Sequence, residues 1–299
     1  MKKVLPYIEK AAVVFFVLIF LAFAVLIVHA VLTLYKNGLE DFFKEWNPTV
    51  DSDVAIIDGE NETFLVNGEA LESSDALEKY FSSYYSQDSL VFADGIMYVA
   101  RRTYFKSEGE IYIEVKVCGI NFKTGEDKII YVENYCVDEG APSTLYYDGK
   151  IYICDGVKTI EIDIGTLTVE EFPADYFLSL PKKYEVRIET SENEKIIDEK
   201  VVIRHGDAER ELMLSYFAEN NEYIKKIVDS ANDIRFNRNG FFQKSYVVND
   251  KIYLFCCVLD RDGESNGILF SYDYITEEIL FIYHSFSSEH SDIRVVPCI

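Results

Sequence analysis

A sequence motif, a turn followed by strand residues, recurs along this 299-residue chain. The spacing of its copies constrains the fold more than any other feature. The clearest copy begins at Asp148, where Asp-Gly is followed by Lys-Ile-Tyr-Ile-Cys and, after a short loop, by Thr-Ile-Glu-Ile-Asp-Ile. Asp-Gly suits a two-residue hairpin turn because glycine tolerates a positive φ, and β-branched and aromatic residues suit strands. Copies begin at Asp94 and at Asn249, and a degenerate copy begins at Asp198.

The copies follow one another at a nearly constant distance. Equivalent positions are Tyr98, Tyr152, Val202 and Tyr253, which are spaced by 54, 50 and 51 residues. A fixed period of about 50 residues with several short strands per repeat is typical of propeller blades. We therefore predict an all-β, propeller-like array of four or five four-stranded antiparallel blades. A β-meander sandwich with similar hairpins is the alternative.

In these residues the chain resembles β-propellers of the kelch and quinoprotein type. Those blades share a turn, a Lys-Ile-Tyr strand, a loop and a strand that ends in Asp-x-x-Thr, and the resemblance covers residues 90–286. Two departures limit it. Phe255-Cys256 stands where a kelch blade has paired glycines, and the closing tryptophan of either family is missing, since the only tryptophan is Trp46. The resemblance therefore implies the fold and no functional residue, and we expect no quinone or other cofactor.

An uncharged segment, residues 11–35, precedes the repeats and follows a short tail, residues 1–10. About 20 apolar residues cross the hydrocarbon core as a helix, so we predict a transmembrane helix over 11–35. A signal peptide cleaved after Ala30 is the alternative, because Val28-His29-Ala30 fits the cleavage pattern, but the apolar run is longer than a signal peptide needs.

The flanking charges predict the orientation of this anchor. Lys2, Lys3 and Lys10 precede it, whereas Lys36 and Lys44 follow it among acidic residues. Positive charge favours the cytoplasmic side. We expect a single-pass protein of the cell membrane with a cytoplasmic amino terminus and its large domain outside.

Four shorter segments carry further expectations. We predict an amphipathic helix over residues 36–48, which lies on the bilayer or packs under the first blade. Residues 49–299 are expected to form the extracytoplasmic domain. The hairpin in 53–65 is expected to supply a strand that closes the ring, and 74–86 have the pattern of an amphipathic helix. Residues 223–228 have helical periodicity, whereas their place in the repeat favours an outer strand, and the sequence leaves this choice open with a preference for the strand.

Charge excludes one class of partner. Outside the anchor and tail, 26 basic residues (29 less Lys2, Lys3 and Lys10) face 51 acidic ones (52 less Glu9), a net charge of −25. Nucleic-acid binding requires a basic surface, so we expect no nucleic-acid partner. Cations and basic peptides are favoured by the field of the domain, although acidity also serves solubility alone.

The six cysteines are expected to be mostly free, buried thiols, because several fall inside predicted strands and no Cys-x-x-Cys spacing occurs. They are Cys118, Cys136, Cys154, Cys256, Cys257 and Cys298.

No motif predicts catalysis or metal binding. Residues 263–267 match Gly-x-Ser-x-Gly, but the Ser265 loop is flanked by predicted strands, whereas a nucleophile elbow requires a strand, a turn and a helix. The oxygen ligands at Asp260, Asp262, Glu264 and Asn266 lack the glycine spacing of a calcium loop. The histidines at 29, 205, 284 and 290 have no zinc-protease spacing, and Asn61 begins a glycosylation sequon.

We therefore expect a membrane-anchored binding or scaffold protein and not an enzyme, with its ligand at the axial mouth where loops of several blades converge. A protein, a cationic peptide or a glycan is the expected ligand. One alternative is a glycan hydrolase with paired carboxylates at that mouth. Another is an accessory subunit of a membrane complex. The sequence assigns no catalytic, ligand-binding or metal residue.

Overall fold

The computed structural model describes residues 46–58, 63–71, 85–107, 109–136, 141–181, 184–189, 199–229, 235–236, 241–259, 265–287 and 293–299. Contacts divide the chain into two units, Met1–Asn47 and Pro48–Ile299. Within the described part, no helix is both long and apolar enough to cross a bilayer. The predicted anchor at 11–35 and the sequon residue Asn61 lie outside the described residues.

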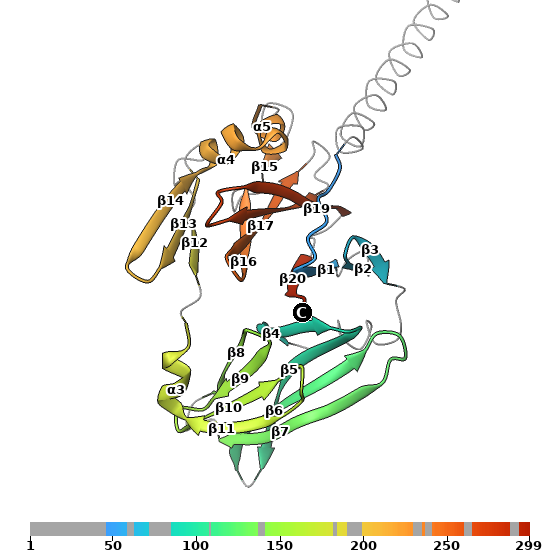
Figure 1. The fold of residues 1–299 in the computed structure, drawn as a ribbon, viewed down its shortest axis with the longest axis vertical. Coiled ribbons are helices and arrows are strands. Elements are labelled where there is room, and N and C mark those ends of the chain that lie inside the picture. Colours follow the sequence, from blue (N-terminus) through green and yellow to red (C-terminus); the bar gives the residue numbers. More distant parts are fainter. Residues whose placement is uncertain are drawn as a thin grey trace, which may run out of the picture. The chain divides into compact units, whose positions relative to one another are not determined.

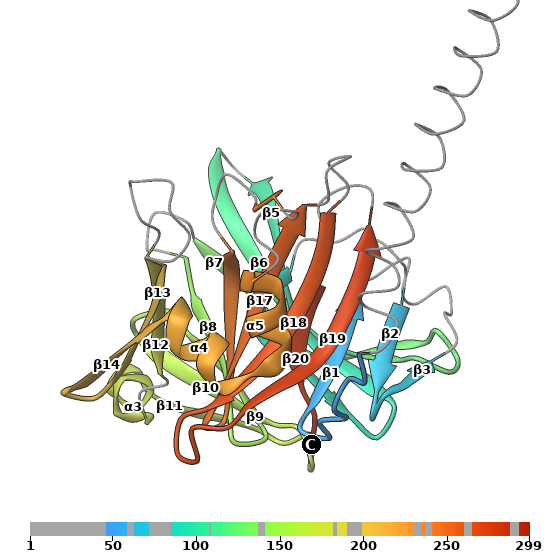
Figure 2. The same cartoon turned by 90° about the horizontal axis from the view of Figure 1, so that it is seen from above.

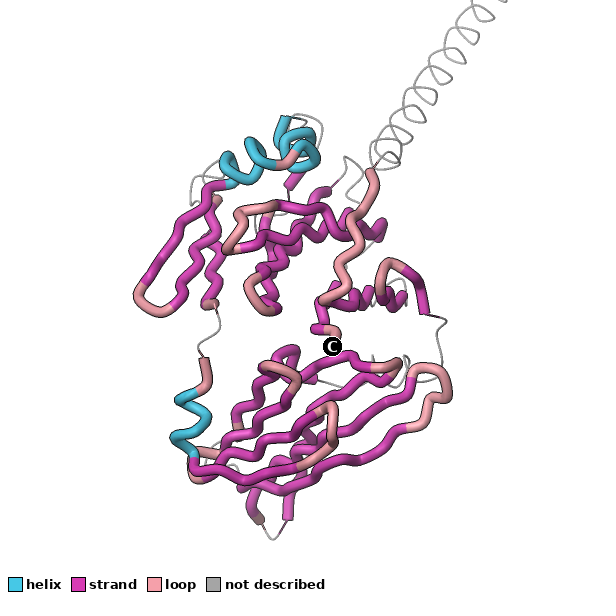
Figure 3. Tube along the Cα trace, in the orientation of Figure 1, coloured by secondary structure: helices cyan, strands magenta, loops and turns pink. Residues whose placement is uncertain are grey.

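The described strands of Pro48–Ile299 form five antiparallel sheets, the blades of a five-bladed propeller (Figure 1). Figure 3 shows how strands dominate the unit and how the three described helices lie at its periphery. Blade 1 consists of β20(Ile293–Pro297), β1(Val54–Asp58), β2(Thr63–Val66) and β3(Glu69–Leu71). Blade 2 consists of β4(Tyr85–Ala93), β5(Ile96–Ser107), β6(Glu110–Asn121) and β7(Asp127–Cys136).

The remaining blades follow in chain order. Blade 3 consists of β8(Ser143–Tyr147), β9(Lys150–Cys154), β10(Lys158–Asp163) and β11(Val169–Pro173), and α3(Ala174–Ser179) comes next. Blade 4 has β12(Glu185–Glu189), β13(Lys200–His205) and β14(Ala208–Met213), followed by α4(Leu214–Asn220) and α5(Glu222–Asp229). Blade 5 has β15(Arg235–Phe236) and β16(Phe242–Val248), which both pair with β17(Lys251–Leu259), and then β18(Ser265–Asp273) and β19(Ile279–Ser287).

Equivalent residues of the repeated motif lie in equivalent strands. Tyr98, Tyr152 and Tyr253 are buried in β5, β9 and β17, each next to the innermost strand of its blade. The Asp-x-x-Thr ending builds the following turn, because Asp163 Oδ1 accepts hydrogen bonds from both N and Oγ1 of Thr166. Asp273 caps the corresponding turn of blade 5 through the backbone N of Thr276, at 2.8 Å. The repeat-based prediction of propeller blades is confirmed.

The ring is closed by strands from opposite ends of the domain. β1 pairs with β20, so that Ile57 lies opposite Arg294, and on its other side β1 pairs with β2, where Ile57 lies opposite Phe64. Next to this closure, Lys251 Nζ lies 2.9 Å from both Asp51 Oδ2 and Asp53 Oδ2. The prediction that the hairpin in 53–65 supplies a closing strand is therefore confirmed.

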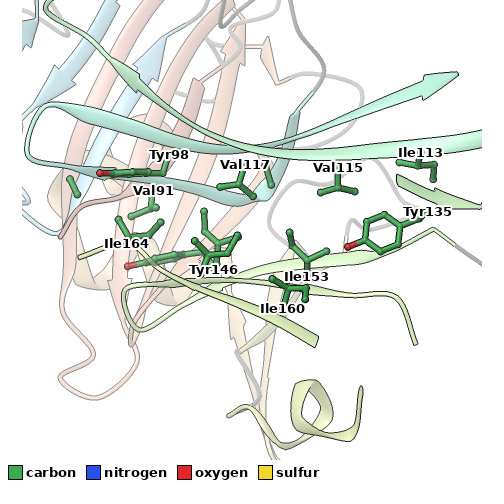
Figure 4. Packing of buried hydrophobic residues seen from close by; sticks show 14 residues of the cluster. Val91, Tyr98, Ile113, Val115, Val117, Tyr135, Tyr146, Ile153, Ile160 and Ile164 are labelled. Carbon is green, nitrogen blue, oxygen red and sulfur yellow. The ribbon is translucent and has the colours of Figure 1, made fainter. Parts of the chain in front are cut away.

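The apolar core lies between blades. Blades 2 and 3 face each other through aliphatic side chains and tyrosines, among them Val115 and Tyr135 on blade 2, and Tyr146 and Ile160 on blade 3 (Figure 4). A second cluster joins blades 1 and 2, and a third joins blades 5 and 1. The many aromatic residues of the repeats therefore serve the packing of one blade against the next.

Four of the five innermost strands end on one side of the ring. β20 and β4 run parallel, with a bridge between Phe92 and Cys298, and the backbone N of Ile299 donates to Phe92 O at 3.0 Å. The ends of β8, β16 and β20 line one cavity at this side. We call it the C-terminal face; Figure 2 shows it at the lower edge, where the C-terminus is marked.

Blade 4 departs from the repeat. Its described residues form three strands. β12 begins at the C-terminal face, because Tyr184, directly before β12, donates a hydrogen bond to Asp250 in the turn after β16. β12 thus runs against the direction of its neighbour β16. The prediction of four-stranded blades does not hold here, and Val202, in β13, is not in the orientation of its supposed equivalents Tyr152 and Tyr253.

Residues 223–228 belong to α5, so the helical alternative is correct and the preferred outer strand is not. Ile224 and Ile227 are buried on one face of this helix. Asn221 Oδ1 accepts hydrogen bonds from the backbone N of Tyr223 and of Ile224, which caps the helix. Local periodicity therefore outweighs the position in the repeat. Of the helix predicted at 74–86, residues 85 and 86 belong to β4 and the others lie outside the described residues.

All six cysteines are free, as predicted. Cys118, Cys256 and Cys257 are buried in strands, and the other three are half-buried.

The closure at β1 generates a prediction about stability. Ile57 is fully buried between β2 and β20, so Ile57→Ala leaves a cavity at the joint. We expect the free energy of unfolding to fall by about 2–5 kcal/mol. The exposed Ile275, with 69% of its surface accessible, provides the control Ile275→Ala, which should change it by less than about 0.5 kcal/mol. Urea unfolding of the full-length chain measures both, and equal effects would contradict the role of the joint.

Candidate binding site at the C-terminal face

A cavity of ≈ 250 Å³ opens at the C-terminal face, and four blades contribute to its lining. The lining residues are Tyr146, Tyr147 and Asp148 of blade 3, Tyr184, His205 and the preceding Pro181 at blade 4, Val247, Val248, Asn249 and Asp250 of blade 5, and Pro297 of blade 1. The sequence predicted a ligand site at an axial mouth, and this cavity lies where strand ends and turns of four blades meet.

Two hairpin turns of the repeat bring polar side chains to the cavity. Asp148 and Asn249 occupy the same turn position in blades 3 and 5 and have φ of 48° and 53°. Asn and Asp tolerate this left-handed conformation better than other residues with a Cβ. In blade 3 the next residue is Gly149, at φ 75°, whereas blade 5 has Asp250 there, at a φ that is not positive. Blade 5 thus replaces the glycine of the repeat with a carboxylate at the cavity.

The wall next to Asp250 is aromatic. Tyr184 is 8% exposed, and its hydroxyl donates to Asp250 Oδ1 at 2.7 Å. Its ring stacks on His205, with 4.4 Å between centroids, and lies 4.7 Å from the ring of Tyr274. Burial, and then the hydrogen bond with Asp250, raises the pKa of Tyr184, so its hydroxyl stays protonated and donating. This stack fixes one side of the cavity.

Blade 3 supplies two more tyrosines. Tyr146 is buried, and its hydroxyl accepts a hydrogen bond from the backbone N of Gly149 at 3.2 Å. Burial raises the pKa of Tyr146. Tyr147 is half-buried at the end of β8. Rings therefore contribute to the lining from blade 3 as well as from blade 4.

A guanidinium lies against this aromatic group. Arg210 Nη1 donates to the hydroxyl of Tyr272 at 2.6 Å, and the Arg210 guanidinium carbon lies 4.4 Å from the centre of the Tyr274 ring. Arg210 Nη1 also forms an ion pair with Glu277 Oε1, at 3.0 Å. This is a cation–π contact with a neighbouring carboxylate. The surroundings of the cavity therefore already hold one cation between a ring and an acid.

The acids at the cavity have few partners. Asp148 and Asp250 are exposed, and within the described ranges Asp148 has no hydrogen bond or ion pair, while the Asp250 carboxylate accepts only from Tyr184. The basic side chains nearby are engaged elsewhere: Lys150 pairs with Glu161, and Lys251 with Asp51 and Asp53. Lys182 and Lys183 lie outside the described residues. The described part of the site is therefore acidic.

A second, smaller cavity of ≈ 200 Å³ lies between blades 5 and 1, beneath the segment 48–51. Val54, Ile56, Leu65 and Ile282 make its lining largely apolar, and His284 also contributes. Burial lowers the pKa of His284, because the imidazolium loses hydration there.

Of the residues singled out from catalytic and metal-binding motifs, the structure places only His205 at the cavity of the C-terminal face, among those that it describes. Ser265 begins β18 and pairs with Leu259 and Ser287, so no helix follows it as a nucleophile elbow requires. Asp260, Asp262 and Glu264 lie outside the described residues, as do His29 and His290. His205 lines the main cavity and His284 the second one. Among the described residues, no cluster of three or more His, Cys, Asp or Glu side chains could hold a metal ion.

Sequence reasoning missed the three side chains that define the aromatic wall and its acid: Tyr184, His205 and Asp250. Asp250 could have been found, because it interrupts the Asp-Gly turn of the repeat. Tyr184 and His205 could not, because their placement depends on the reversed direction of blade 4.

Comparison with known proteins adds little. No family model and no curated protein matches the sequence. Similar solved structures include the α-L-arabinofuranosidase of Podospora anserina in complex with cellotriose, at 11% identity and a TM-score of 0.25, covering 69% of this chain and 70% of that one. The catalytic domain of the Coprinopsis cinerea GH62 α-L-arabinofuranosidase has 10% identity and a TM-score of 0.23, covering 66% and 67%.

A GH62 hydrolase in complex with xylotriose has 12% identity and a TM-score of 0.24, covering 69% of this chain and 72% of that one. TM-scores this low carry no argument about this chain, and the five-bladed fold rests on its own five sheets.

The lowered pKa of His284 predicts a pH dependence of stability. His284 stays neutral in the folded chain below the pH of about 6.5 at which an unfolded histidine takes up a proton. The unfolded state then binds more protons, so the free energy of unfolding falls as the pH falls. We expect the wild type to lose more stability between pH 7.5 and pH 5.5 than His284→Gln. Urea unfolding at both pH values measures this, and equal losses would show that burial of His284 has no such effect.

Proposed function

We propose that the chain is a non-catalytic binding protein that holds its ligand in the cavity at the C-terminal face. The observation that carries the proposal is the cavity itself, which turns and strand ends of four blades build together. Convergence of loops on a rigid scaffold is the usual arrangement of a binding site. The walls combine tyrosine rings with a few polar side chains, which is the composition of small-ligand pockets.

The proposal includes display of the propeller outside the cell by the uncharged segment 11–35. The support is the length of that segment and the positive charge before it, at Lys2, Lys3 and Lys10. The cavity would then face a ligand of the cell surface or of the surrounding medium.

A second candidate function is hydrolysis of a glycan. Two carboxylates from different blades, Asp148 and Asp250, line the one cavity, and glycoside hydrolysis requires an acid pair across the substrate. The two functions differ in turnover. A hydrolase releases a chromophore from an aryl glycoside and loses this activity in Asp250→Asn, whereas a binding protein releases none in either form.

The test of binding uses thermal unfolding of the full-length chain in detergent with three probes: calcium ions, xylotriose and a capped tripeptide with a central arginine. A probe at 100 times its dissociation constant should stabilise the fold by about 2.7 kcal/mol, which raises the melting temperature. Val247→Trp fills the cavity and should abolish the shift. Val157→Trp, at a position 82% exposed, is the control and should retain it.

Should Val247→Trp fail to fold, Tyr147→Ala, which removes one wall, replaces it. A shift that survives both cavity variants, or the lack of a shift with any probe, would contradict binding in this cavity.

The anchor has a test of its own. We expect the full-length chain to stay in the membrane fraction after alkaline washing, and a chain lacking residues 1–35 to be released, because 11–35 supply the apolar length that a span requires. Intact-mass measurement of the membrane form should show residues 1–30 retained. A mature protein that begins after Ala30 would instead establish a cleaved signal peptide.

A further inference from the structure

We propose that the ligand of this cavity is a cationic side chain, an arginine guanidinium or a lysine ammonium presented by a basic peptide. This inference rests on the proposed binding function and names the chemistry of its ligand. It starts from the combination of features in one cavity: rings on blades 3 and 4, carboxylates from blades 3 and 5, and a strongly acidic domain around them.

The half-buried ring of Tyr147 is the aromatic surface of the cavity that a cation can reach. An ammonium or guanidinium is attracted to the face of an aromatic ring, and the attraction increases when the site excludes water. Tyr147 is half-buried in the cavity lining, and the buried Tyr184 is fixed by its stack with His205 and its hydrogen bond to Asp250. The Tyr184 ring is covered by His205 and Tyr274, so Tyr184 holds Asp250 in place and Tyr147 provides the ring for the cation.

The carboxylates supply the second half of the recognition. The Asp250 carboxylate is an exposed acceptor, and the Tyr184 hydroxyl, held protonated by burial, orients it by donation to Oδ1. One described hydrogen bond leaves further acceptor positions on this carboxylate, because an ionised carboxylate accepts several. Asp148 has no partner among the described residues. Asp148 and Asp250 both line the cavity, and each offers acceptors to a planar guanidinium, which has five donors.

The protein itself shows the same recognition next to the cavity. Arg210 places its guanidinium over Tyr274, donates to Tyr272 and pairs with Glu277. Tyr274 in turn contacts Tyr184, the ring that lines the cavity. A guanidinium between tyrosines and an acid is therefore an arrangement that this face already holds. The cavity has the same kinds of group, a tyrosine ring at Tyr147 and a carboxylate at Asp250, and leaves the cation to be supplied from outside.

The long-range field favours the same ligand. The domain carries a net charge of −25 over residues 36–299, which raises the association rate of a basic peptide and lowers that of an acidic polymer. A neutral glycan would use the tyrosine rings but would gain nothing from this field. The combined charge and geometry therefore favour the peptide over the glycan.

The test compares two capped tripeptides, glycine–arginine–glycine and glycine–citrulline–glycine, by calorimetric titration of the full-length chain in detergent. Citrulline keeps the shape of arginine and removes its charge. We expect the arginine peptide to bind about tenfold or more tightly than the citrulline peptide, as a cation between rings and acids requires. Its affinity should also fall as salt is raised.

Variants locate the interaction. Asp250→Asn and Asp148→Asn should each weaken the arginine peptide by about tenfold. Asp94→Asn is the control, because Asp94 has the same turn position in blade 2, with φ of 50°, and does not line the cavity. Asparagine at this turn position is native in blade 5, at Asn249, so the fold should accept Asp148→Asn and Asp94→Asn.

The outcomes separate this inference from the proposed function. Equal affinity for both peptides would overturn the cationic ligand. Binding of xylotriose alone, abolished by Val247→Trp, would also overturn the cationic ligand, while the proposed binding function would stand. If no probe binds, both proposals fail. If Asp94→Asn and Asp250→Asn lowered the affinity for the arginine peptide equally, the effect would come from the overall charge of the domain and not from a site at the cavity.

Discussion

The pairing of β1 with β20 is the constraint on which the structure depends. It joins residues 54–58 to residues 293–297, and only after it forms do blades 1 and 5 bury their shared cluster. Each apolar core of this domain lies between two blades, so a blade without its neighbour exposes one of its faces. The entropy cost of closing such a long loop grows only slowly with its length, and the burial it permits offsets that cost. Closure and core are therefore one event.

Most of the blade architecture could be predicted from the sequence, for a physical reason. A repeat needs the same local chemistry at each copy, and here the copies share a turn with positive φ, a buried tyrosine and an Asp-x-x-Thr turn. These are local interactions, which short stretches of sequence determine. The closing role of the hairpin in 53–65 was predictable too, because its alternating residues need a partner strand and the first regular blade begins later.

Blade 4 marks the limit of that reasoning. The degenerate copy at Asp198 fits the period, yet β13 lacks the buried tyrosine of the other copies and has Val202 in its place. Helical spacing takes over after Met213, where Leu214 and Phe217 of α4, followed by Ile224 and Ile227 of α5, are buried. The strand direction depends on how the chain returns from α3 to the C-terminal face, which no local pattern encodes. The sequence therefore predicted a regular blade here, whereas tertiary packing produces a reversed blade followed by two helices.

The candidate site arises from these departures. At the C-terminal face the regular blade 3 contributes an Asp-Gly turn and, directly before it, Tyr146 and Tyr147. Reversal of blade 4 brings the start of β12 and the end of β13 to that face, and with them Tyr184 and His205. Asp250 then occupies a position where glycine would leave Tyr184 without its hydrogen-bond acceptor. A natural fold tends to break its own local rules at functional sites. Two independent departures, in blades 4 and 5, meet at a single hydrogen bond on the wall of one cavity, and this coincidence is the strongest structural reason to place function there.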